Sequence, residues 1–232
     1  MIQDQPGSIS HSSFGLVPPD WYYRASKRNL LWMLPLSAKR VLEVGCAEGN
    51  FGAFVKSKLG AEVWGIELNP DAAEQARKSL DKVYTGDAAT IMTELKTSPF
   101  DCIVMFDVLE HMMNPDVVLR KAKNLLSDNG TVILCVPNVL YASNLYRLII
   151  KKDWKYLSHG VLDVTHLRYF TKKSLIRMII DNDYEIADLR GFEPLTGVSL
   201  LPFYVISLLS LGYYHEIKYT QFAAIIKPKN RY

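Results

Sequence analysis

The sequence predicts an α/β fold in which a mostly parallel sheet carries helices on both faces. From residue 40 onward, short β-branched runs alternate with longer segments of helical period, and five rounds of this alternation are clear. Each run ends near Gly, Pro, Asn or Asp, the residues that commonly end strands and begin turns. Strands that alternate with helices in this way pair in parallel, because each helix carries the chain back across the sheet.

The composition is that of an ordinary globular domain. The chain has 232 residues, of which 49% are hydrophobic and 22% charged, so it is neither disordered, collagen-like nor of low complexity. A formal net charge of +3 is too small to indicate a nucleic-acid partner by itself. Cys46, Cys102 and Cys135 lie in or beside apolar runs without paired spacing, so we expect neither a disulfide framework nor a zinc cluster, and a cytoplasmic location.

Seven strands and several helices can be placed. The predicted strands are Arg40–Gly45, Glu62–Leu68, Val83–Asp87, Phe100–Val108, Thr131–Pro137, Tyr184–Gly191 and Gln221–Lys227. The helices placed with defined ends are Asn50–Leu59, which Gly60 ends, a second from Pro70 to about Leu80, and Lys172–Asp181 after Thr171. Helical segments fill the remaining gaps.

Three regions fall outside this alternation. Residues 1–20 resemble a flexible, polar tail without signal-peptide anatomy, so we expect one domain over 21–232. Residues 138–170 are aromatic and basic and predict an insert or cap beside the substrate. Residues 194–214 carry no charge, and 194–215 is interpreted as an apolar insert before the last strand. A packed helical insert is favoured there over contact with a membrane surface or apolar substrate, and a bilayer span is least favoured because prolines and glycines interrupt the segment.

The most informative motif is the turn after the first strand. Small residues stand at Gly45, Ala47 and Gly49, where backbone N–H groups can approach a ligand at the carboxyl end of the strand. A dinucleotide fingerprint would require glycine at positions 45, 47 and 50, but Ala47 and Asn50 break that pattern. The turn therefore disfavours a nicotinamide-dependent oxidoreductase.

The motif and those that follow it resemble the class I S-adenosylmethionine-dependent methyltransferases, over about residues 20–192. Their first motif is D/E-x-G-x-G-x-G, from which this chain departs only at Ala47. The segment Asp107-Val108-Leu109-Glu110-His111 resembles the D-V-L-E-H segment of small-molecule methyltransferases such as those of quinone biosynthesis. The resemblance implies a Rossmann-like sheet and S-adenosylmethionine as cofactor.

The resemblance also implies which residues hold the cofactor. Glu67, 22 residues after Gly45, can accept hydrogen bonds from the ribose hydroxyls, and Asp87 is placed to meet the adenine amino group. Trp21-Tyr22-Tyr23-Arg24 resembles a segment that closes over the cofactor, with Arg24 pairing with its carboxylate, although a packed aromatic helix start remains open. The full predicted set is Tyr23, Arg24, Glu43, Gly45, Cys46, Ala47, Gly49, Glu67, Leu68, Asp87, Ala88, Asp107 and Val108.

Two histidines are candidates for the chemistry. His111 lies four residues after Asp107, at the expected start of the next helix, and can contact the acceptor or remove its proton. His166 opens the segment H-L-R-Y-F-T, which resembles a branch of the family associated with sugar, surface-glycan or lipid-linked acceptors. A purely structural histidine remains the alternative at both positions.

Further substrate contacts are expected from the same region. Asp163 can orient His166, and Arg168 can hold an acidic or hydroxyl-rich substrate; His159 and Tyr169 complete the predicted substrate set. No metal site is expected, because no third ligand of suitable spacing accompanies His159 and His166. The fourth motif lacks the D/N-P-P-Y/F/W pattern of amino-methylating nucleic-acid enzymes, so nucleic acid is an unlikely substrate.

The sequence thus predicts methyl transfer from S-adenosylmethionine to a small-molecule or glycan acceptor, as O-methylation by in-line displacement with a histidine assisting proton removal. A lipid-linked acceptor and peripheral membrane contact through 194–214 are compatible with the apolar insert. The alternative is a non-catalytic S-adenosylmethionine-binding module in a complex. The sequence does not indicate an oligomeric state.

Overall fold

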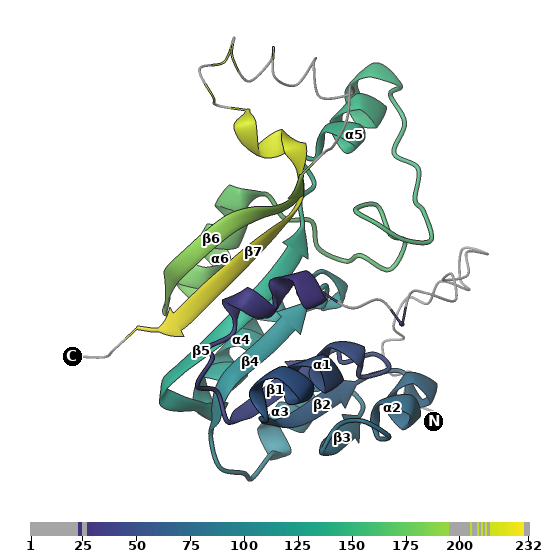
Figure 1. The fold of residues 1–232 in the computed structure, drawn as a ribbon. Helices are drawn as coiled ribbons and strands as arrows, with labels where there is room; N and C mark the ends of the chain where they lie inside the picture. The colour runs from purple at the N-terminus through teal and green to yellow at the C-terminus, as the bar shows by residue number, and fades with distance from the viewer. Residues whose placement is uncertain are drawn as a thin grey trace, which may run out of the picture.

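The computed structural model describes residues 23–24, 27–194, 205, 208, 210, 212 and 214–229. These residues contain a seven-stranded sheet of order β3-β2-β1-β4-β5-β7-β6 (Figure 1). The strands are β1 (Arg40–Val44), β2 (Glu62–Glu67), β3 (Lys82–Thr85), β4 (Phe100–Phe106), β5 (Leu126–Pro137), β6 (Tyr184–Pro194) and β7 (Tyr219–Pro228). Strands β1 to β5 pair in parallel, and β7 runs antiparallel to β5 and β6. The predicted mostly parallel, seven-stranded sheet is confirmed.

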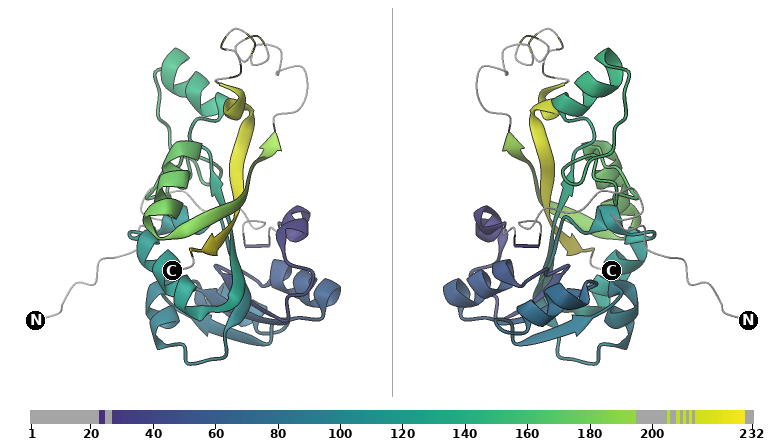
Figure 2. Two further views of the ribbon diagram at one scale, coloured as in Figure 1. Left: turned by 90° about the vertical axis from the view of Figure 1, so that its left-hand side faces the viewer. Right: turned by 90° about the vertical axis from the view of Figure 1, so that its right-hand side faces the viewer.

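Helices cover both faces of the sheet. The helices are α1 (Asn50–Leu59), α2 (Pro70–Ala76), α3 (Ala88–Glu94), α4 (Pro115–Leu125), α5 (Ala142–Leu145) and α6 (Lys172–Asp181). Short 3-10 turns form η2 (Arg28–Met33), η3 (Leu109–His111) and η6 (His215–Lys218), and η4 (Tyr146–Ile150) is a single π-helical turn. In the side views of Figure 2, η2 and α1 lie on one side of the sheet and α4 and α6 on the other.

The central strands are apolar on both sides because both faces are covered. Along β4, Ile103 and Met105 pack in the core under α4 and α6, whereas Cys102 and Val104 pack in the core under η2 and α1. This two-sided burial explains the continuous apolar runs of the sequence, which lack the alternation of a one-sided sheet. The three cysteines are unpaired and buried, as their spacing predicts.

Helix ends follow local chemistry. Gly60 ends α1 in the left-handed conformation, with φ at 62°. Thr171 caps α6 in a reciprocal capping box with Ser174. The second helix is shorter than predicted: α2 ends at Ala76, because the following N–H groups of Lys78 and Ser79 bond three residues back and tighten the chain into a turn.

Every strand differs from its predicted bounds by one to five residues at one end or both, and for two of them the structure shows the cause. Strand β4 ends at Phe106, two residues early, because the next residue, Asp107, has a φ of 52° and leaves the extended conformation. Strand β5 begins at Leu126, which pairs with Phe100 across an irregular step in the register before regular pairing starts at Thr131.

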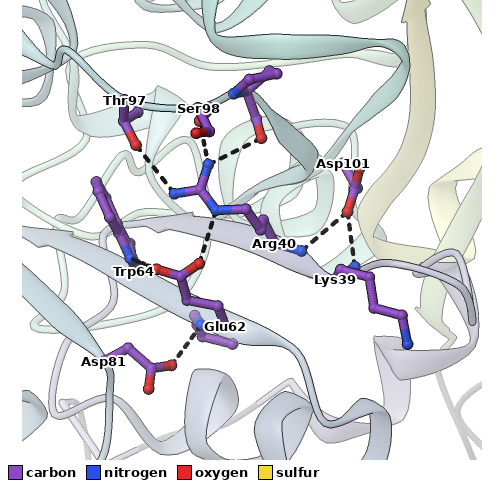
Figure 3. A network of polar contacts seen from close by, with 10 residues as sticks. Lys39, Arg40, Glu62, Trp64, Asp81, Thr97, Ser98 and Asp101 are labelled. Atoms are coloured by element: carbon purple, nitrogen blue, oxygen red, sulfur yellow. Dashed lines mark hydrogen bonds and ion pairs between the residues drawn. The ribbon is translucent and has the colours of Figure 1, made fainter.

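Arg40 organises the amino-terminal end of the sheet (Figure 3). Its guanidinium donates to Glu62 Oε2 at 2.8 Å, to Thr97 Oγ1 at 3.1 Å and to the carbonyls of Ser98 and Pro99. Since ligands of such sheets bind beyond the carboxyl ends of the strands, this network at the opposite end fixes the loops without entering the site.

The predicted cap, 138–170, leaves the carboxyl end of β5 and carries α5 beyond the sheet (Figure 1). It is fastened at its root by Asn138, whose buried amide donates to the carbonyls of Glu216 and Tyr219 at 3.0 and 2.9 Å. Its far end pairs back through a bridge between Asn138 and Phe170. The cap is therefore held over the ends of the strands.

Two predicted regions cannot be compared with the structure. The tail, 1–20, and most of the apolar segment, 194–214, lie outside the described residues. Within the described ranges, none of the helices has the length and apolar character that a membrane span requires.

Candidate active site

The turn after β1 is built from left-handed residues. Gly45, Ala47 and Gly49 have φ angles of 73°, 48° and 80°. The amides of Gly45 and Cys46 donate to the carbonyl of Ile66 at 2.8 and 3.1 Å, which ties the turn to the end of β2. A side chain at Gly45 would overlap the side chain of Val108, so position 45 requires glycine for space as well as for conformation.

Glu67 fixes this turn from the next strand. Its buried carboxylate accepts from the amide of Ala47 at 2.8 Å through Oε2 and from the amide of Asn69 at 2.8 Å through Oε1. Each carboxylate oxygen has a further lone pair, so the group can also accept from a ligand hydroxyl. The alanine in place of the usual glycine is accommodated, and Glu67 holds its backbone.

Glu43 lies in β1, just before the turn, and its side chain is buried. Its Oε2 atom has no hydrogen-bond partner, and a Cβ atom on Gly52 would lie 2.8 Å from it. Burial raises the pKa of Glu43 to about 8, and the neighbouring Glu67 carboxylate raises it further, against an opposing hydrogen bond from Gly52. Glu43 is therefore largely protonated at neutral pH.

The other predicted cofactor residues lie near Glu48 or follow strands β2 and β3. Tyr23 accepts from the amide of Glu48 through its carbonyl at 3.3 Å, and Arg24 lies 3.7 Å from the Glu48 carboxylate. Asp87 caps α3 by accepting from the amide of Thr90 at 2.8 Å, which places Ala88 first in that helix. Leu68 is largely exposed at the end of β2, whereas Trp21 and Tyr22 lie outside the described residues.

Asp107 belongs to a polar network that the sequence did not predict. It pairs with Lys27 at 3.0 Å and accepts from Gln221 Nε2 at 2.6 Å, while Lys27 also donates to Gln221 Oε1 at 2.6 Å. Burial by itself would lower the pKa of Lys27. The nearby negative charges, of which Asp107 has the largest effect, outweigh burial, so the pKa is raised. Lys27 precedes η2, Asp107 follows β4 and Gln221 lies in β7, so no local pattern relates the three residues.

The two predicted histidines are in contact with each other. The rings of His111 and His166 have centroids 4.8 Å apart and an interplanar angle of 71°. The cap brings them together, because the amides of Leu167 and Arg168 donate to the carbonyl of Glu110 at 2.8 and 3.0 Å. His111 lies in the 3-10 turn η3, and the next helix, α4, begins only at Pro115.

The hydrogen bonds define the tautomer of each imidazole. Thr165 Oγ1 donates its proton to Asp163 Oδ1 at 2.7 Å, so it accepts from His111 Nδ1 at 2.9 Å. His166 Nδ1 lies 3.0 Å from the carbonyl of Val161, which can only accept. Both rings thus carry their proton on Nδ1, so the lone pair belongs to Nε2. Burial, together with the neighbouring His166, lowers the pKa of His111 to about 4, so this ring is neutral near pH 7.

Glu110 completes a cluster of three. Its side chain is fully buried, and neither carboxylate oxygen has a hydrogen-bond partner. Burial, together with the charge of Asp107, raises its pKa well above the ordinary value. Glu110, His111 and His166 each place one ligand atom within 4.8 Å of the others.

The comparisons with known proteins place the chain in a family. A family model described as a methyltransferase domain matches residues 21–189. The chain belongs to this family. The ubiquinone biosynthesis O-methyltransferase of Glaesserella parasuis serovar 5 is 32% identical to this methyltransferase over 69% of this chain and 72% of that protein. The enzyme of the same name from Xanthomonas oryzae pv. oryzae is 30% identical over 45% of this chain and 46% of its own length.

Solved structures share the fold of this methyltransferase. An S-adenosylmethionine-dependent methyltransferase from Archaeoglobus fulgidus superposes with a TM-score of 0.68 at 18% identity, over 90% of this chain and 97% of that one. A possible histamine N-methyltransferase from Thermotoga maritima gives a TM-score of 0.61 at 18% identity, over 90% of each chain. The predicted class, the class I S-adenosylmethionine-dependent methyltransferases, is confirmed, and with it the predicted cofactor.

Of the remaining predicted substrate residues, Tyr169 packs against other aromatic rings, whereas Arg168 and His159 are exposed. Tyr169 packs between His166 and Trp154, with ring centroids 6.3 and 5.4 Å away. Arg168 is exposed and donates to the carbonyl of Met113, which fastens the cap to the loop before α4. His159 is also exposed and bonds to Ser158 at 3.2 Å, and it is not among the residues whose ligand atoms converge.

Sequence reasoning missed Glu110 as a member of this group. The sequence suggested His159 and His166 as the pair to which a third metal ligand would have to be added. In the structure, His166 lies instead beside two consecutive residues, Glu110 and His111. The signal was present in the motif itself, where a carboxylate and an imidazole stand side by side directly after a buried strand.

Proposed function

We propose that this methyltransferase transfers the methyl group of S-adenosylmethionine to a hydroxyl oxygen of a small-molecule or glycan acceptor. One observation carries the proposal: the glycine turn and the turn that carries His111 both contact Val108. Val108 occupies the space above Gly45, and its carbonyl accepts from the amide of His111 at 3.1 Å. A methyl donor held by the turn therefore has an imidazole near its reactive end.

The residues around the turn hold the cofactor in this proposal. The backbone of Gly45, Ala47 and Gly49 approaches it closely, Glu67 accepts from the ribose hydroxyls, and Asp87 and Ala88 meet the adenine. The protein's main task is then alignment, because the sulfonium is already reactive. The acceptor oxygen bonds to the methyl carbon as the carbon–sulfur bond breaks, S-adenosylhomocysteine leaves, and the hydroxyl proton is removed with the help of His111 or His166.

The exposed surface of η4 supports an acceptor that has an apolar part and a negative charge. Leu148, Ile149 and Ile150 are exposed on η4, directly before Lys151 and Lys152. Such a combination of apolar and basic side chains suits a lipid-linked or otherwise amphipathic, anionic acceptor. The O-methyltransferase relatives named for ubiquinone biosynthesis support a small molecule, and the H-L-R-Y-F-T segment supports a glycan.

Peripheral membrane contact through 194–214 is part of this proposal and is tested separately. We expect the protein to co-sediment with anionic liposomes, and polar substitutions at Leu208 and neighbouring apolar positions to reduce the bound fraction. Binding that such substitutions leave unchanged would remove this segment as the contact.

The cofactor site is tested by calorimetric titration with S-adenosylmethionine and S-adenosylhomocysteine after co-purified ligand has been stripped. We expect micromolar binding by the wild type and a collapse of binding in Glu67→Ala. Glu62→Ala is the matched control, because it removes the same group at the opposite end of the same strand. Circular dichroism checks that each variant is folded.

The outcomes separate the alternatives. A folded wild type that binds neither ligand would contradict the proposal. Binding followed by formation of S-adenosylhomocysteine with a hydroxyl acceptor would support it. Tight binding without turnover across sugars, phenols and lipid-linked acceptors would favour a non-catalytic module.

A further inference from the structure

We propose that Glu110, His111 and His166 form a binding site for one divalent transition-metal ion, which takes an acceptor hydroxyl at an open coordination position. The role of the ion toward the acceptor rests on the proposed function, whereas the site itself rests on the three side chains. They come from η3 and from the cap, so the closed cap assembles the site.

The distances between the three ligand atoms are slightly longer than those in an occupied metal site. The three ligand atoms all lie within 4.8 Å of one another. Ligand atoms of a tetrahedral zinc site are about 3.3 Å apart when each bond is 2.0–2.1 Å long. Small side-chain rotations close this difference, since the carboxylate of Glu110 is held by no hydrogen bond.

The surrounding hydrogen bonds orient both imidazoles as metal ligands. A metal-bound histidine commonly donates its second ring N–H to a carbonyl or a carboxylate, which fixes the ring and its tautomer. His166 donates from Nδ1 to the carbonyl of Val161 at 3.0 Å. His111 donates from Nδ1 to Thr165, whose hydroxyl is itself bonded to the buried carboxylate of Asp163. In both rings Nε2 is therefore the nitrogen that can serve as the metal ligand.

Glu110 supplies the observation that is independent of the histidines. A fully buried carboxyl group with no hydrogen bond to either oxygen costs free energy, and native proteins compensate nearly all such groups. A second buried carboxylate, Asp163, comes from the cap and is joined to His111 through Thr165. A cation bound to Glu110 satisfies its oxygen and offsets this concentration of negative charge.

The donor set indicates the class of ion. Two imidazole nitrogens and one carboxylate oxygen favour Zn²⁺, Co²⁺ or Fe²⁺ over Ca²⁺ and Mg²⁺, which prefer oxygen ligands. Three protein ligands leave at least one position open, as in catalytic rather than structural zinc sites. A hydroxyl bound there has a lower pKa and releases its proton to solvent water more readily, so the imidazoles assist proton removal through the ion.

The test is a titration of chelator-treated protein with Co²⁺, followed by visible absorption and calorimetry, and then competition with Zn²⁺. We expect one Co²⁺ per chain with a micromolar or tighter dissociation constant. Glu110→Gln and His166→Ala are expected to weaken binding by about 100-fold or more. His215→Ala is the matched control, because it removes an exposed histidine from η6.

The outcomes are distinct from those of the cofactor titration. S-adenosylmethionine is titrated into the same chelator-treated protein, so cofactor binding without Co²⁺ binding would sink the metal site and leave the proposed function standing. Co²⁺ binding that survives in folded Glu110→Gln and His166→Ala would also overturn the site. If Glu110 is only a buried neutral acid, Glu110→Gln will leave Co²⁺ binding and thermal stability unchanged, and the proposal is then wrong.

Discussion

The glycine turn and the Glu110–His111–His166 cluster adjoin the same residue, Val108, and are built in opposite ways. The turn is made by consecutive residues, and its conformation is set by their own φ angles. The cluster joins η3 to a cap residue 55 positions further along the chain, and its ring orientations come from cap atoms. The turn therefore depends on local backbone chemistry, and the cluster depends on tertiary closure.

The largest expected effect comes from filling the space at the turn. Gly45→Ala places a methyl group against Val108 and forces a left-handed residue other than glycine, so we expect S-adenosylmethionine affinity to fall by at least about 100-fold. Calorimetric titration measures the loss. Gly60→Ala is the matched control: φ there is 62°, but no atom lies within 4 Å of the added methyl.

A double variant distinguishes crowding from strain at the same position. If contact with Val108 causes the loss, Gly45→Ala combined with Val108→Ala should recover part of the affinity. No recovery would assign the effect to backbone strain alone. Unchanged affinity in Gly45→Ala would mean that the turn does not approach the cofactor.

Glu43 gives the turn a pH dependence of its own, with the same sign as that of Glu110 in the cluster, because burial raises the pKa of both carboxyl groups. The folded chain holds this proton up to a pKa of about 8, whereas the ordinary value is 4.5, so the unfolded chain binds fewer protons between these pH values. The free energy of unfolding therefore falls as pH rises through this window, on the order of 2 kcal/mol between pH 6 and pH 8. Urea denaturation of the wild type and Glu43→Gln at several pH values measures it. We expect a smaller slope in Glu43→Gln, with the contribution of Glu110 remaining, and parallel curves would contradict the assignment.

The features that could be predicted from the sequence are those that residues close together in the chain determine. The strand cores, the end of α1 at Gly60 and the start of α6 at Thr171 follow from local patterns and were placed correctly. The glycine turn also belongs to this group, because its small residues are consecutive and the carboxylate of Glu67 follows at a regular strand spacing.

What the sequence missed depends on contacts between distant segments. Asp107 lies 80 residues after Lys27 and 114 residues before Gln221. The order of β4, β5 and β7 in the sheet brings Asp107 near Gln221, and the chain before η2 places Lys27 against both. Likewise, nothing local reveals that Glu110 lacks a hydrogen-bond partner, because the cap that buries it is a separate segment. The motif therefore identified Glu110 in the sequence but did not show that its carboxyl group is buried without a hydrogen bond.

The cluster can be weakened through the residue that orients it. Thr165→Val removes the hydroxyl that accepts from His111 Nδ1, so we expect Co²⁺ affinity and turnover to fall by about tenfold while S-adenosylmethionine affinity stays unchanged. Thr165→Ser is the matched control, because it keeps the hydroxyl. Equal losses in both variants, or a loss of cofactor affinity, would show that Thr165 acts on the cap rather than on His111.

The smallest expected effect concerns Ala47, the one position at which the turn departs from its family motif. With φ at 48°, its methyl group is strained, and Ala47→Gly relieves about 1 kcal/mol or more of that strain while making the unfolded chain more flexible. We expect a net gain in unfolding free energy of about 0.5 kcal/mol and little change in cofactor affinity, since Glu67 holds the amide in either case. Lys152→Gly, at an exposed residue with φ of 53°, is the control for strain relief away from the site. If Ala47→Gly loses affinity while Lys152→Gly gains stability, the methyl group of Ala47 contributes a contact to the cofactor rather than only strain to the turn.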